Sequence, residues 1–556
     1  MTLRVRWLGR VRYRDAHALQ RALHERSVDD HVLLLEHPHV YTMGVRAKRE
    51  HVLVDPASVG AELVDTDRGG DVTYHGPGQL VGYPIVSVPP GPDATPRYVH
   101  AIEQLIIDAL ADLGVPGAST LDGYPGVWIE DRKVCAIGVR ITRGRSMHGF
   151  ALNVDPDLPM FGHIVPCGIT DKAVTSLAAE GAQVTMREVV DAVAARASAL
   201  WGSRDGWERT DAAWVVRPDD LSAFTRGAGA GRPAGEARPR ASTVNGQPVR
   251  LLGRLAAAGV DSSTALPIAE RKPEWLRVKA DMGPEYRALK RTMRSNELVT
   301  VCEEAGCPNI FDCWNAGTAT FMINGERCTR ACGFCLVDTR HPLALDPGEP
   351  ARVAAAVASM GLRHAVVTAV ARDDLTDGGA AAFAATIEAI RTRGGDGVGV
   401  EVLIPDCKGD PAALDVIFAA RPDVLNHNLE TVLRLQRAVR PSASYARSLA
   451  VLARAKAAGL TTKSGLMVGL GETTDEVVAA MADLRAVGVD VLTIGQYLRP
   501  TANHLPVARW WTPDEFDDLR VVGEAMGFAH VQSSPLTRSS YHAGTAFGRA
   551  QAHIRA

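Results

Sequence analysis

The sequence predicts an α+β domain over residues 1–217, a flexible linker over 218–266, and an α/β domain over 267–556 that forms a partial TIM-type (β/α) barrel. In the first region, strand and helix patterns follow no regular period. In the last region they alternate roughly every 25 to 35 residues, which is typical of βαβ units around a parallel sheet. The middle region is rich in Gly, Ala, Pro and Arg and offers almost no apolar side chain for a core.

The overall composition is that of a folded globular protein, since 46% of the 556 residues are hydrophobic and 22% are charged. The 61 basic and 64 acidic side chains leave a formal charge of −3, so we expect no general attraction to nucleic acid or to anionic lipid. No uncharged apolar run is long enough to span a membrane. The first residues are basic and lack the apolar run of a secretory signal, and we therefore expect a cytoplasmic protein.

The first region contains strand-like and helix-like segments in mixed order. Residues 31–37, 126–129, 133–141 and 148–154 are rich in β-branched residues, which predicts strands. Over residues 98–113, apolar side chains recur at helical spacing, which predicts an amphipathic helix that packs on the sheet. This mixture favours an α+β fold for the first region.

The last region predicts about six βα units. Strand-like segments occur at residues 364–370, 398–406, 461–471, 491–498 and 528–534. Helical patterns lie between them, and two of the helices begin with capping signals, Thr473 with Glu476 and Thr512 with Glu515. In a β/α barrel the functional groups gather at the carboxyl ends of the strands, so we expect the chemistry at that edge.

Six of the nine cysteines lie close together in the sequence. Cys302, Cys307 and Cys313 have the spacing C-x4-C-x5-C, and Cys328, Cys332 and Cys335 have the spacing C-x3-C-x2-C. In a reducing compartment such spacings predict a metal site instead of disulfides. Two sets of three thiolates favour iron–sulfur clusters with an open position, although a two-zinc site with shared thiolates would also use six.

The segment CTRACGFC (328–335) resembles the cluster loop of radical S-adenosylmethionine (SAM) enzymes. Within that superfamily, VCEEAGCPNIFDCW (301–314) and RSSYHAG (538–544) are similar to lipoyl synthase, and the resemblance extends over roughly 267–556. It implies two [4Fe–4S] clusters. One is held by the second cysteine set and binds SAM at its open iron, and an auxiliary one is held by the first set together with Ser540. The implied reaction inserts sulfur from the auxiliary cluster at C6 and C8 of a protein-bound octanoyl chain by radical chemistry.

The same resemblance implies an electron donor such as ferredoxin or flavodoxin. Asn428, Glu430 and Lys463 lie where strands of the barrel are expected to end, and they are candidate SAM contacts. Each of the three would also suit a solvated loop, and we keep that interpretation open.

Glycines crowd the segment RGGDVTYHGPGQLVGYP (68–84), which predicts a backbone that approaches a ligand closely. Cys167 lies between Pro166 and Gly168, a loop position instead of the interior of a strand. A lone cysteine is usually a small core residue, and Cys135 fits that interpretation well.

The motifs RGGDVTYHGPGQL, KVCAIGVR, HGFALNV and IVPCGI follow in this order and resemble lipoyl(octanoyl) transferase, whose architecture is related to biotin and lipoate ligases. The resemblance implies that Cys167 takes an octanoyl group from acyl carrier protein as a thioester and passes it to a lysine of a lipoyl domain. Lys133 would lower the pKa of the thiol and move the proton. The implied acyl pocket comprises Arg68, Gly69, Gly70, Asp71, Val72, Thr73, Tyr74, His75, Ala136, Ile137, Gly138, Gly149, Phe150 and Ala151.

Together, the two resemblances predict a bifunctional enzyme that acts on lipoyl domains of 2-oxoacid dehydrogenase complexes and on the glycine cleavage H protein. Two other interpretations remain open. The chain would be a non-catalytic iron–sulfur or zinc-stabilised protein that binds lipoyl domains, or its first region would be a thiol hydrolase. Loss of folding or binding on Cys328→Ala would favour the first alternative, and octanoate released to water without acyl-lysine would favour the second.

Overall fold

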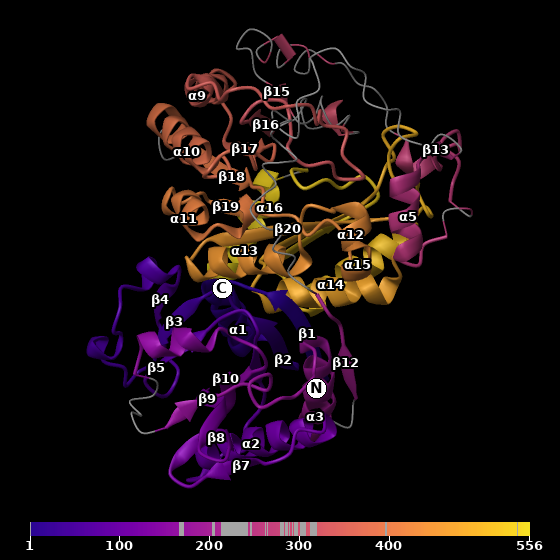
Figure 1. The fold of residues 1–556 in the computed structure, drawn as a ribbon. Helices are drawn as coiled ribbons and strands as arrows, with labels where there is room; N and C mark the ends of the chain where they lie inside the picture. The colour runs from indigo at the N-terminus through magenta and orange to yellow at the C-terminus, as the bar shows by residue number, and fades with distance from the viewer. Residues whose placement is uncertain are drawn as a thin grey trace, which may run out of the picture. The chain divides into compact units, whose positions relative to one another are not determined.

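The computed structural model shows two compact units, Met1–Val216 and Arg217–Ala556 (Figure 1). The structure describes the chain except for residues 1, 166–171, 203–205, 213–242, 245–246, 262, 264, 278–282, 284–286, 288–289, 292, 294–298, 301–306, 308, 312–319, 395–396, 542 and 556.

The first unit is built on a nine-stranded mixed sheet. Eight strands follow the order β12-β1-β2-β6-β10-β9-β8-β7, and β11 pairs with β9 beside them. Their bounds are β1 (Leu3–Arg10), β2 (Asp30–Glu36), β6 (Gln79–Ile85), β7 (Ala118–Leu121), β8 (Tyr124–Ile129), β9 (Arg132–Thr142), β10 (Arg145–Asn153), β11 (Ala173–Val174) and β12 (Trp207–Arg209). A second sheet of order β4-β3-β5 contains β3 (Val40–Met43), β4 (Glu62–Asp65) and β5 (Val72–His75).

The described helices of this unit are α1 (Tyr13–Arg26), α2 (Ala94–Asp112) and α3 (Met186–Trp201). Helices α2 and α3 pack together and bury an apolar core against the large sheet, to which Ile106, Val193 and Phe150 contribute. The four predicted strands and the predicted helix are confirmed as β2, β8, β9, β10 and α2. The α+β class of the first unit is therefore confirmed.

The second unit is built on an eight-stranded sheet whose strands follow chain order from β15 to β22. Their bounds are β15 (Val299–Thr300), β16 (Thr320–Ile323), β17 (His364–Ala369), β18 (Gly399–Leu403), β19 (Val424–Asn426), β20 (Thr461–Val468), β21 (Val491–Gln496) and β22 (His530–Ser533). Neighbours from β16 to β22 pair in parallel, and β15 runs antiparallel to β16. Among the described residues β16 and β22 do not pair, so the α/β barrel is partial, as predicted.

Of the helices of this unit, α9, α10 and α11 lie on the outer side of the curved sheet beside β16 to β19 (Figure 1). The bounds of these three and of the helices that follow are α9 (Glu349–Ser359), α10 (Ala380–Gly394), α11 (Pro411–Ala419), α12 (Gln436–Val439), α13 (Tyr445–Ala457), α14 (Thr474–Ala486), α15 (Pro513–Ala525) and α16 (Ala543–Arg555). Both predicted caps are confirmed, because Thr473 and Thr512 form reciprocal capping boxes with Glu476 and Glu515 at the starts of α14 and α15.

The structure places the end of the predicted linker, residues 249–266, in the second unit. Val249–Ala257 forms a helix, α5, that contacts α12 and buries Leu255. Arg434 donates a hydrogen bond to the Ala258 carbonyl, and Leu266 pairs with Val507 in an isolated β-bridge. Apolar residues at helical spacing allow this stretch to bury one face, which the preceding Gly- and Pro-rich stretch does not offer.

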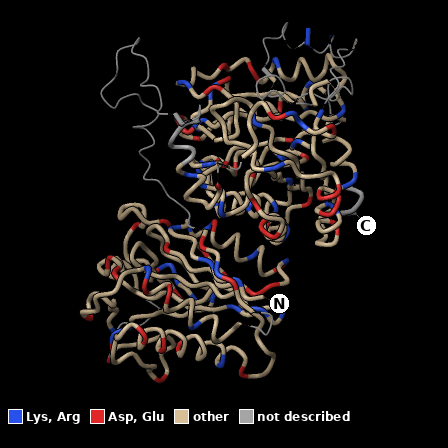
Figure 2. Tube along the Cα trace, turned by 90° about the vertical axis from the view of Figure 1, so that its right-hand side faces the viewer, with Lys and Arg blue, Asp and Glu red and all other residues tan. Residues whose placement is uncertain are grey.

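Basic and acidic residues are interspersed along the described trace of both units (Figure 2), in keeping with the formal charge of −3. No helix in the described part of the chain has the length and hydropathy needed to cross a membrane.

Candidate active sites

A cavity in the first unit lies where β5, β6, β9 and β10 meet the 68–70 turn. Most of the predicted acyl-pocket residues line it, namely Arg68, Gly69, Gly70, Thr73, His75, Ala136, Ile137, Gly138, Gly149, Phe150 and Ala151. Close backbone approach requires glycine here. A Cβ on Gly149 would lie 2.2 Å from the Gly82 carbonyl oxygen, and a Cβ on Gly82 would lie 2.1 Å from the Phe150 ring.

Three residues of the predicted pocket lie elsewhere. Thr73 and His75 face the cavity, but side chains alternate along β5, so Val72 and Tyr74 point into the small apolar core beneath β3 and β5. Asp71 precedes the strand, and its Oδ2 accepts a hydrogen bond from His51 Nδ1 at 2.7 Å. The sequence motif is continuous, whereas the strand presents only every second residue to the pocket.

Lys133 reaches the cavity side of the sheet because β9 contains a bulge. Trp128 of β8 pairs with Lys133, and the residue before it, Val127, pairs with Cys135, so Val134 is an extra residue on β9. Val134 and Cys135 both point into the apolar core, and Lys133 lies opposite them. Its ammonium lies 4.7 Å from the centroid of the Trp128 ring.

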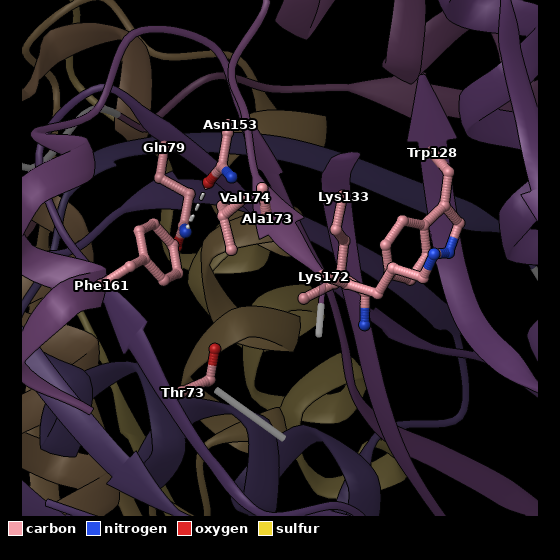
Figure 3. A pocket seen from close by; sticks show the side chains of 10 residues that line it. Thr73, Gln79, Trp128, Lys133, Asn153, Phe161, Lys172, Ala173 and Val174 are labelled. Atoms are coloured by element: carbon pink, nitrogen blue, oxygen red, sulfur yellow. Dashed lines mark hydrogen bonds between the residues drawn. The ribbon is translucent and has the colours of Figure 1, made fainter. Parts of the chain in front are cut away.

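A second, smaller cavity adjoins the first and shares Thr73 and Ala136 with it. Figure 3 shows Lys133, Trp128 and Lys172 on one side of this cavity, and Gln79, Asn153 and Phe161 on the other. The Gln79 amide donates to Asn153 Oδ1 at 2.9 Å, which holds the polar wall in place. Lys133 and Lys172 therefore line a cavity that adjoins the predicted acyl pocket.

Cys167 lies outside the described residues, which resume at Lys172 beside Lys133. Lys172, five residues beyond Cys167, lines the same cavity as Lys133. Strand β11 then pairs Val174 with Lys133, and the Thr175 amide donates to the Lys133 carbonyl at 2.9 Å. Cys135, in contrast, is fully buried in the core, which raises the pKa of its thiol.

Sequence reasoning missed several lining residues. Trp128, Gln79 and Asn153 line the smaller cavity, and Tyr13 and His148 line the larger one. Gln79 belongs to the glycine-rich motif at 68–84, and His148 and Asn153 belong to HGFALNV, but the sequence analysis assigned none of the three to the pocket. Tyr13 comes from α1, and no local pattern in the sequence links that helix to the pocket.

In the second unit, Cys328, Cys332 and Cys335 share one loop between β16 and α9. None of the three forms a disulfide. Burial, with a smaller effect of neighbouring thiols, raises the pKa of Cys332 to about 11 and that of Cys335 to about 12. Three free thiols from one loop are a donor set whose chemistry fits a cluster with one open iron.

The cysteine loop is fixed at the carboxyl edge of the barrel. The Thr329 amide donates to the Ala371 carbonyl beyond β17, and the Gly333 amide donates to the Val439 carbonyl of α12. Arg330, which lies between two of the cysteines, forms buried ion pairs with Asp373 and Asp406. These carboxylates follow β17 and β18, so the loop is held by the edge where the chemistry was expected.

Cys302 and Cys313 lie outside the described residues, whereas Cys307 and Ser540 are described. Asn309 Nδ2 donates to the Leu536 carbonyl at 2.6 Å, which joins the first cysteine segment to the C-terminal one. Burial lowers the pKa of Arg538, and the Cys307 thiol and the Glu430 carboxylate act in the opposite direction. Ser540 lies two residues beyond Arg538, in the turn closed by the Tyr541 amide and the Arg538 carbonyl.

Asn428 and Glu430 lie just beyond the carboxyl end of β19, near the cysteine loop. The Asn428 amide donates to Glu430 Oε1 at 3.1 Å, and the Glu430 carboxylate acts electrostatically on Cys332, Cys335 and Arg538. Glu430 has a φ of 70°, a left-handed conformation that is uncommon for a non-glycine residue. The structure thus brings both residues to the edge that carries the thiols.

Lys463 does not lie at that edge, and the premise of its predicted role as a SAM contact is wrong. It is the third residue of β20, near the amino end of the strand, and it is 1% exposed. Its ammonium binds Glu401 at 2.9 Å inside the barrel, where Asn426 donates to the same carboxylate. Lys463 therefore neutralises a buried carboxylate within the barrel.

Comparison with known families divides the chain in the same way. Residues 12–198 match the lipoyl protein ligase A/B catalytic domain. Residues 260–307 match the N-terminal domain of lipoyl synthase of the radical SAM family, and residues 322–484 match the radical SAM superfamily.

Individual relatives are similar over the second unit. The lipoyl synthase of Rubrobacter xylanophilus is 61% identical over 274 residues, which are 49% of this chain and 85% of the relative. The lipoyl synthase of Nocardia farcinica is 53% identical over 319 residues, which are 57% of this chain and 88% of the relative. Among solved structures, a bi-partite lipoate protein ligase from Thermoplasma acidophilum matches at 18% identity and a TM-score of 0.33, covering 40% of this chain and 91% of that one.

Proposed function

Because the chain belongs to the lipoyl synthase family and carries a lipoyl protein ligase A/B catalytic domain ahead of that region, we propose that it assembles the lipoyl group in two successive reactions. The first unit transfers an octanoyl group from acyl carrier protein to a lysine of a lipoyl domain. The second unit inserts two sulfur atoms into the bound octanoyl chain. The acceptors are lipoyl domains of 2-oxoacid dehydrogenase complexes and the glycine cleavage H protein.

In the first reaction, the Cys167 thiolate attacks the thioester carbonyl of octanoyl-acyl carrier protein, and the carrier thiol leaves with a proton. The acceptor lysine amine then attacks the new thioester, an amide forms, and the Cys167 thiolate is released. The Lys133 ammonium stabilises the thiolate and carries the proton in both halves. No ATP is required, because the donor is already activated.

The observation that carries this assignment is the position of Lys133. A bulge directs its side chain into a cavity that adjoins the proposed acyl pocket, and β11 fixes the chain beyond Cys167 against the same residue. A lysine that served only as an exposed hairpin charge would require neither feature.

An octanoyltransferase and a ligase use different acyl donors, and this difference distinguishes the two reactions. We expect the full chain to form octanoyl-lysine on a lipoyl domain from octanoyl-acyl carrier protein without ATP, as read by intact-protein mass spectrometry. Free octanoate with ATP should give no acylated domain. Acylation only with free octanoate and ATP would assign a ligase, and release of octanoate without acyl-lysine would assign a thiol hydrolase.

In the second unit, Cys328, Cys332 and Cys335 would hold a [4Fe–4S] cluster, and Asn428 and Glu430 would contact SAM beside it. A second [4Fe–4S] cluster would be held by Cys302, Cys307, Cys313 and Ser540. When bound, the SAM cluster supplies the radical chemistry that removes hydrogen from an unactivated carbon, after reduction by a donor such as ferredoxin or flavodoxin. The residues of the chain hold the ligands and exclude water.

The number of clusters has a direct test. Two four-iron clusters predict about eight irons per chain after anaerobic reconstitution. Cys302→Ala should halve the iron content and leave SAM cleavage, whereas Cys328→Ala should halve it and abolish SAM cleavage. Thiolates of this kind stay reduced in the cytoplasm, where we place the protein.

A further inference from the structure

The Lys133 ammonium of the first unit lies against an aromatic ring. Its Nζ is 4.7 Å from the centroid of the Trp128 ring, and both side chains line the smaller cavity (Figure 3). Within the described part of the chain, Lys133 has no ion pair and no side-chain hydrogen bond. A cation over an aromatic face is attracted by the quadrupole of the ring, most strongly where water is excluded. In the described structure, the ring is therefore the contact that holds this charge.

Trp128 is itself held in place. Its ring is fully buried, and its Nε1 donates to the Tyr124 carbonyl at 2.9 Å. The Tyr124 ring meets it edge-on, with the centroids 5.9 Å apart and the planes at 75°. Trp128 of β8 also pairs with Lys133 of β9, so the two side chains stand on the same face of the sheet. Two contacts fix the plane of the ring, and the strand pairing places the lysine beside it.

Gly126 leaves room for the stem of Lys133. It lies two residues before Trp128, and its φ of 128° is unfavourable for residues other than glycine. A Cβ at this position would lie 3.4 Å from Lys133 Cε and 2.5 Å from the Cys135 carbonyl oxygen. The Gly126 amide donates to Glu103 Oε1 at 2.8 Å, which fixes the backbone here. Strand β8 thus offers space to the methylene groups of the lysine and a ring to its charge.

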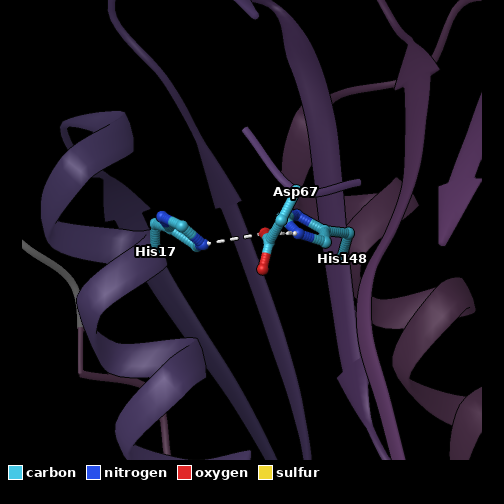
Figure 4. Close-up of side chains that lie close together, drawn as sticks. All are labelled: His17, Asp67 and His148. Carbon is cyan, nitrogen blue, oxygen red and sulfur yellow. Dashed lines mark hydrogen bonds and ion pairs between the residues drawn. The ribbon is translucent and has the colours of Figure 1, made fainter. Parts of the chain in front are cut away.

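The ionised carboxylate beside the larger cavity binds other partners. His17 Nε2 and His148 Nε2 both contact Asp67 Oδ1, at 3.2 Å and 2.8 Å, and Figure 4 shows the carboxylate between the two rings. Arg140 pairs with the other oxygen of Asp67. The hydrogen bonds from His148 and His17 hold the pKa of Asp67 far below its ordinary value, so the carboxylate is ionised. Asp67 thus has three partners, and Lys133 is not among them.

We propose that Trp128 is a positioning residue that holds the Lys133 ammonium at the cavity wall without neutralising it. This inference rests on the proposed octanoyl transfer. A carboxylate partner would also hold the lysine, but its negative charge would offset the positive field that stabilises a thiolate. An aromatic ring attracts the ammonium, carries no net charge and accepts no proton from it. The full positive charge of Lys133 therefore remains available to the reaction.

The test measures octanoyl transfer from acyl carrier protein to a lipoyl domain under single-turnover conditions, with the full chain and without SAM. Trp128→Leu removes the ring and should lower the rate about tenfold, because the ammonium loses its attractive partner. Trp128→Phe keeps an aromatic face and should retain most of the native rate. Phenylalanine lacks the indole N–H, so this variant also separates the effect of the ring from that of the hydrogen bond to Tyr124.

Two readouts separate positioning from a purely structural role. In a Lys133→Met background the ring has no ammonium to hold, so the addition of Trp128→Leu should cause little further loss. Alkylation of Cys167 by iodoacetamide, followed by peptide mass spectrometry, should reach half its maximal rate at a higher pH in Trp128→Leu than in the native chain. The reason is that a misplaced ammonium stabilises the thiolate less. Trp128→Phe should be alkylated like the native chain.

Trp128→Met provides a second ring-free variant, should the leucine variant fail to fold, because methionine adapts to irregular apolar gaps. Native transfer rates in the ring-free variants would overturn the inference, and so would an equal fold-loss from Trp128→Leu with and without Lys133. A phenylalanine variant as impaired as the leucine one would also overturn it. A native chain that transfers no octanoyl group contradicts the proposed function itself, and that failure is visible before any variant is compared.

Discussion

Arg330 and Asp373 form a bidentate ion pair with both N···O distances at 2.7 Å, which fixes the cysteine loop to the segment after β17. The same guanidinium reaches Asp406 at 2.6 Å, and Arg447 binds the other oxygen of Asp406 at 3.2 Å. All four side chains are largely buried. The planar guanidinium matches two carboxylates at once, which a lysine ammonium does not.

Arg330→Gln should destabilise the second unit and lower its iron content. The variant leaves two buried carboxylates short of a partner, at a cost of about 3–5 kcal/mol in the free energy of unfolding. Arg330→Lys keeps the charge and should retain an intermediate amount of iron after anaerobic reconstitution. Arg520→Gln removes an exposed pair with Glu524 and serves as the control. Equal iron and equal urea midpoints in Arg330→Gln and Arg520→Gln would contradict the role of the loop anchor.

Lys463→Met should unfold the barrel more easily without a specific loss of SAM affinity. The substitution removes the ammonium partner of the buried Glu401 carboxylate, at a cost of about 3–5 kcal/mol in the free energy of unfolding. The double variant with Glu401→Gln should recover much of that loss. Thermal unfolding and equilibrium SAM binding distinguish the effects. Normal stability with a selective loss of SAM binding would restore the role that the sequence suggested.

The Glu401–Lys463 pair also predicts a pH dependence. Burial raises the pKa of Glu401, but Lys463 and His364 together outweigh this effect and hold the pKa below its ordinary value. The stabilisation is therefore present above the unfolded pKa of about 4.3 and is lost as pH falls through the lower folded value. The native chain should lose stability in that acidic range more steeply than Glu401→Gln/Lys463→Met. Parallel curves of unfolding free energy against pH would show that the pair does not titrate in this way.

Lys133→Met should reduce octanoyl transfer by a factor of roughly 10² to 10⁴, the usual contribution of a general acid or base. Lys48, which is exposed and pairs with Glu50, provides the matched control for removal of a lysine charge. Acyl-lysine formation under single-turnover conditions measures both variants. Full transfer by Lys133→Met would remove this residue from the reaction, and a large loss in Lys172→Met would then point to the other lysine of the cavity.

Gly82→Ala should lower both stability and transfer, because the added methyl group would overlap the Phe150 ring. Overpacking of this kind costs about 1–3 kcal/mol in the free energy of unfolding. Gly162→Ala, where the new methyl group meets no atom within 4 Å, should be close to neutral. Calorimetry of the two variants and their transfer rates provide the comparison. A neutral Gly82→Ala would mean that the pocket wall yields easily.

Much of the fold follows from local patterns in the sequence. Strands rich in β-branched residues, such as β9 and β17, and the capping residues Thr473 and Thr512 act through their neighbours in the chain. The cysteine loop could also be predicted, because its ligands lie within eight residues. Each of these features is decided over a few positions.

The remaining features depend on contacts between distant residues. The bulge that directs Lys133 into the cavity depends on pairing with β8. The left-handed backbone conformation of His148 is held by the hydrogen bond from its amide to Gln20 on α1. Lys463 lies near the amino end of β20, whereas Glu430 lies just beyond the carboxyl end of β19, although the sequence suggested a strand end for both. The anchors of Arg330 lie 43 and 76 residues away, a separation at which no sequence period operates.

The most direct test of the two-reaction account follows a lipoyl domain by intact-protein mass spectrometry under anaerobic conditions. Given octanoyl-acyl carrier protein, the reconstituted full chain should form the octanoylated domain, and addition of SAM and reductant should convert it to the lipoylated one. Cys328→Ala should stop at the octanoylated domain, and Cys167→Ala should lipoylate only a domain that already carries octanoyl. A domain that stays unmodified with the native chain, or a chain that binds zinc and no iron, would contradict the account.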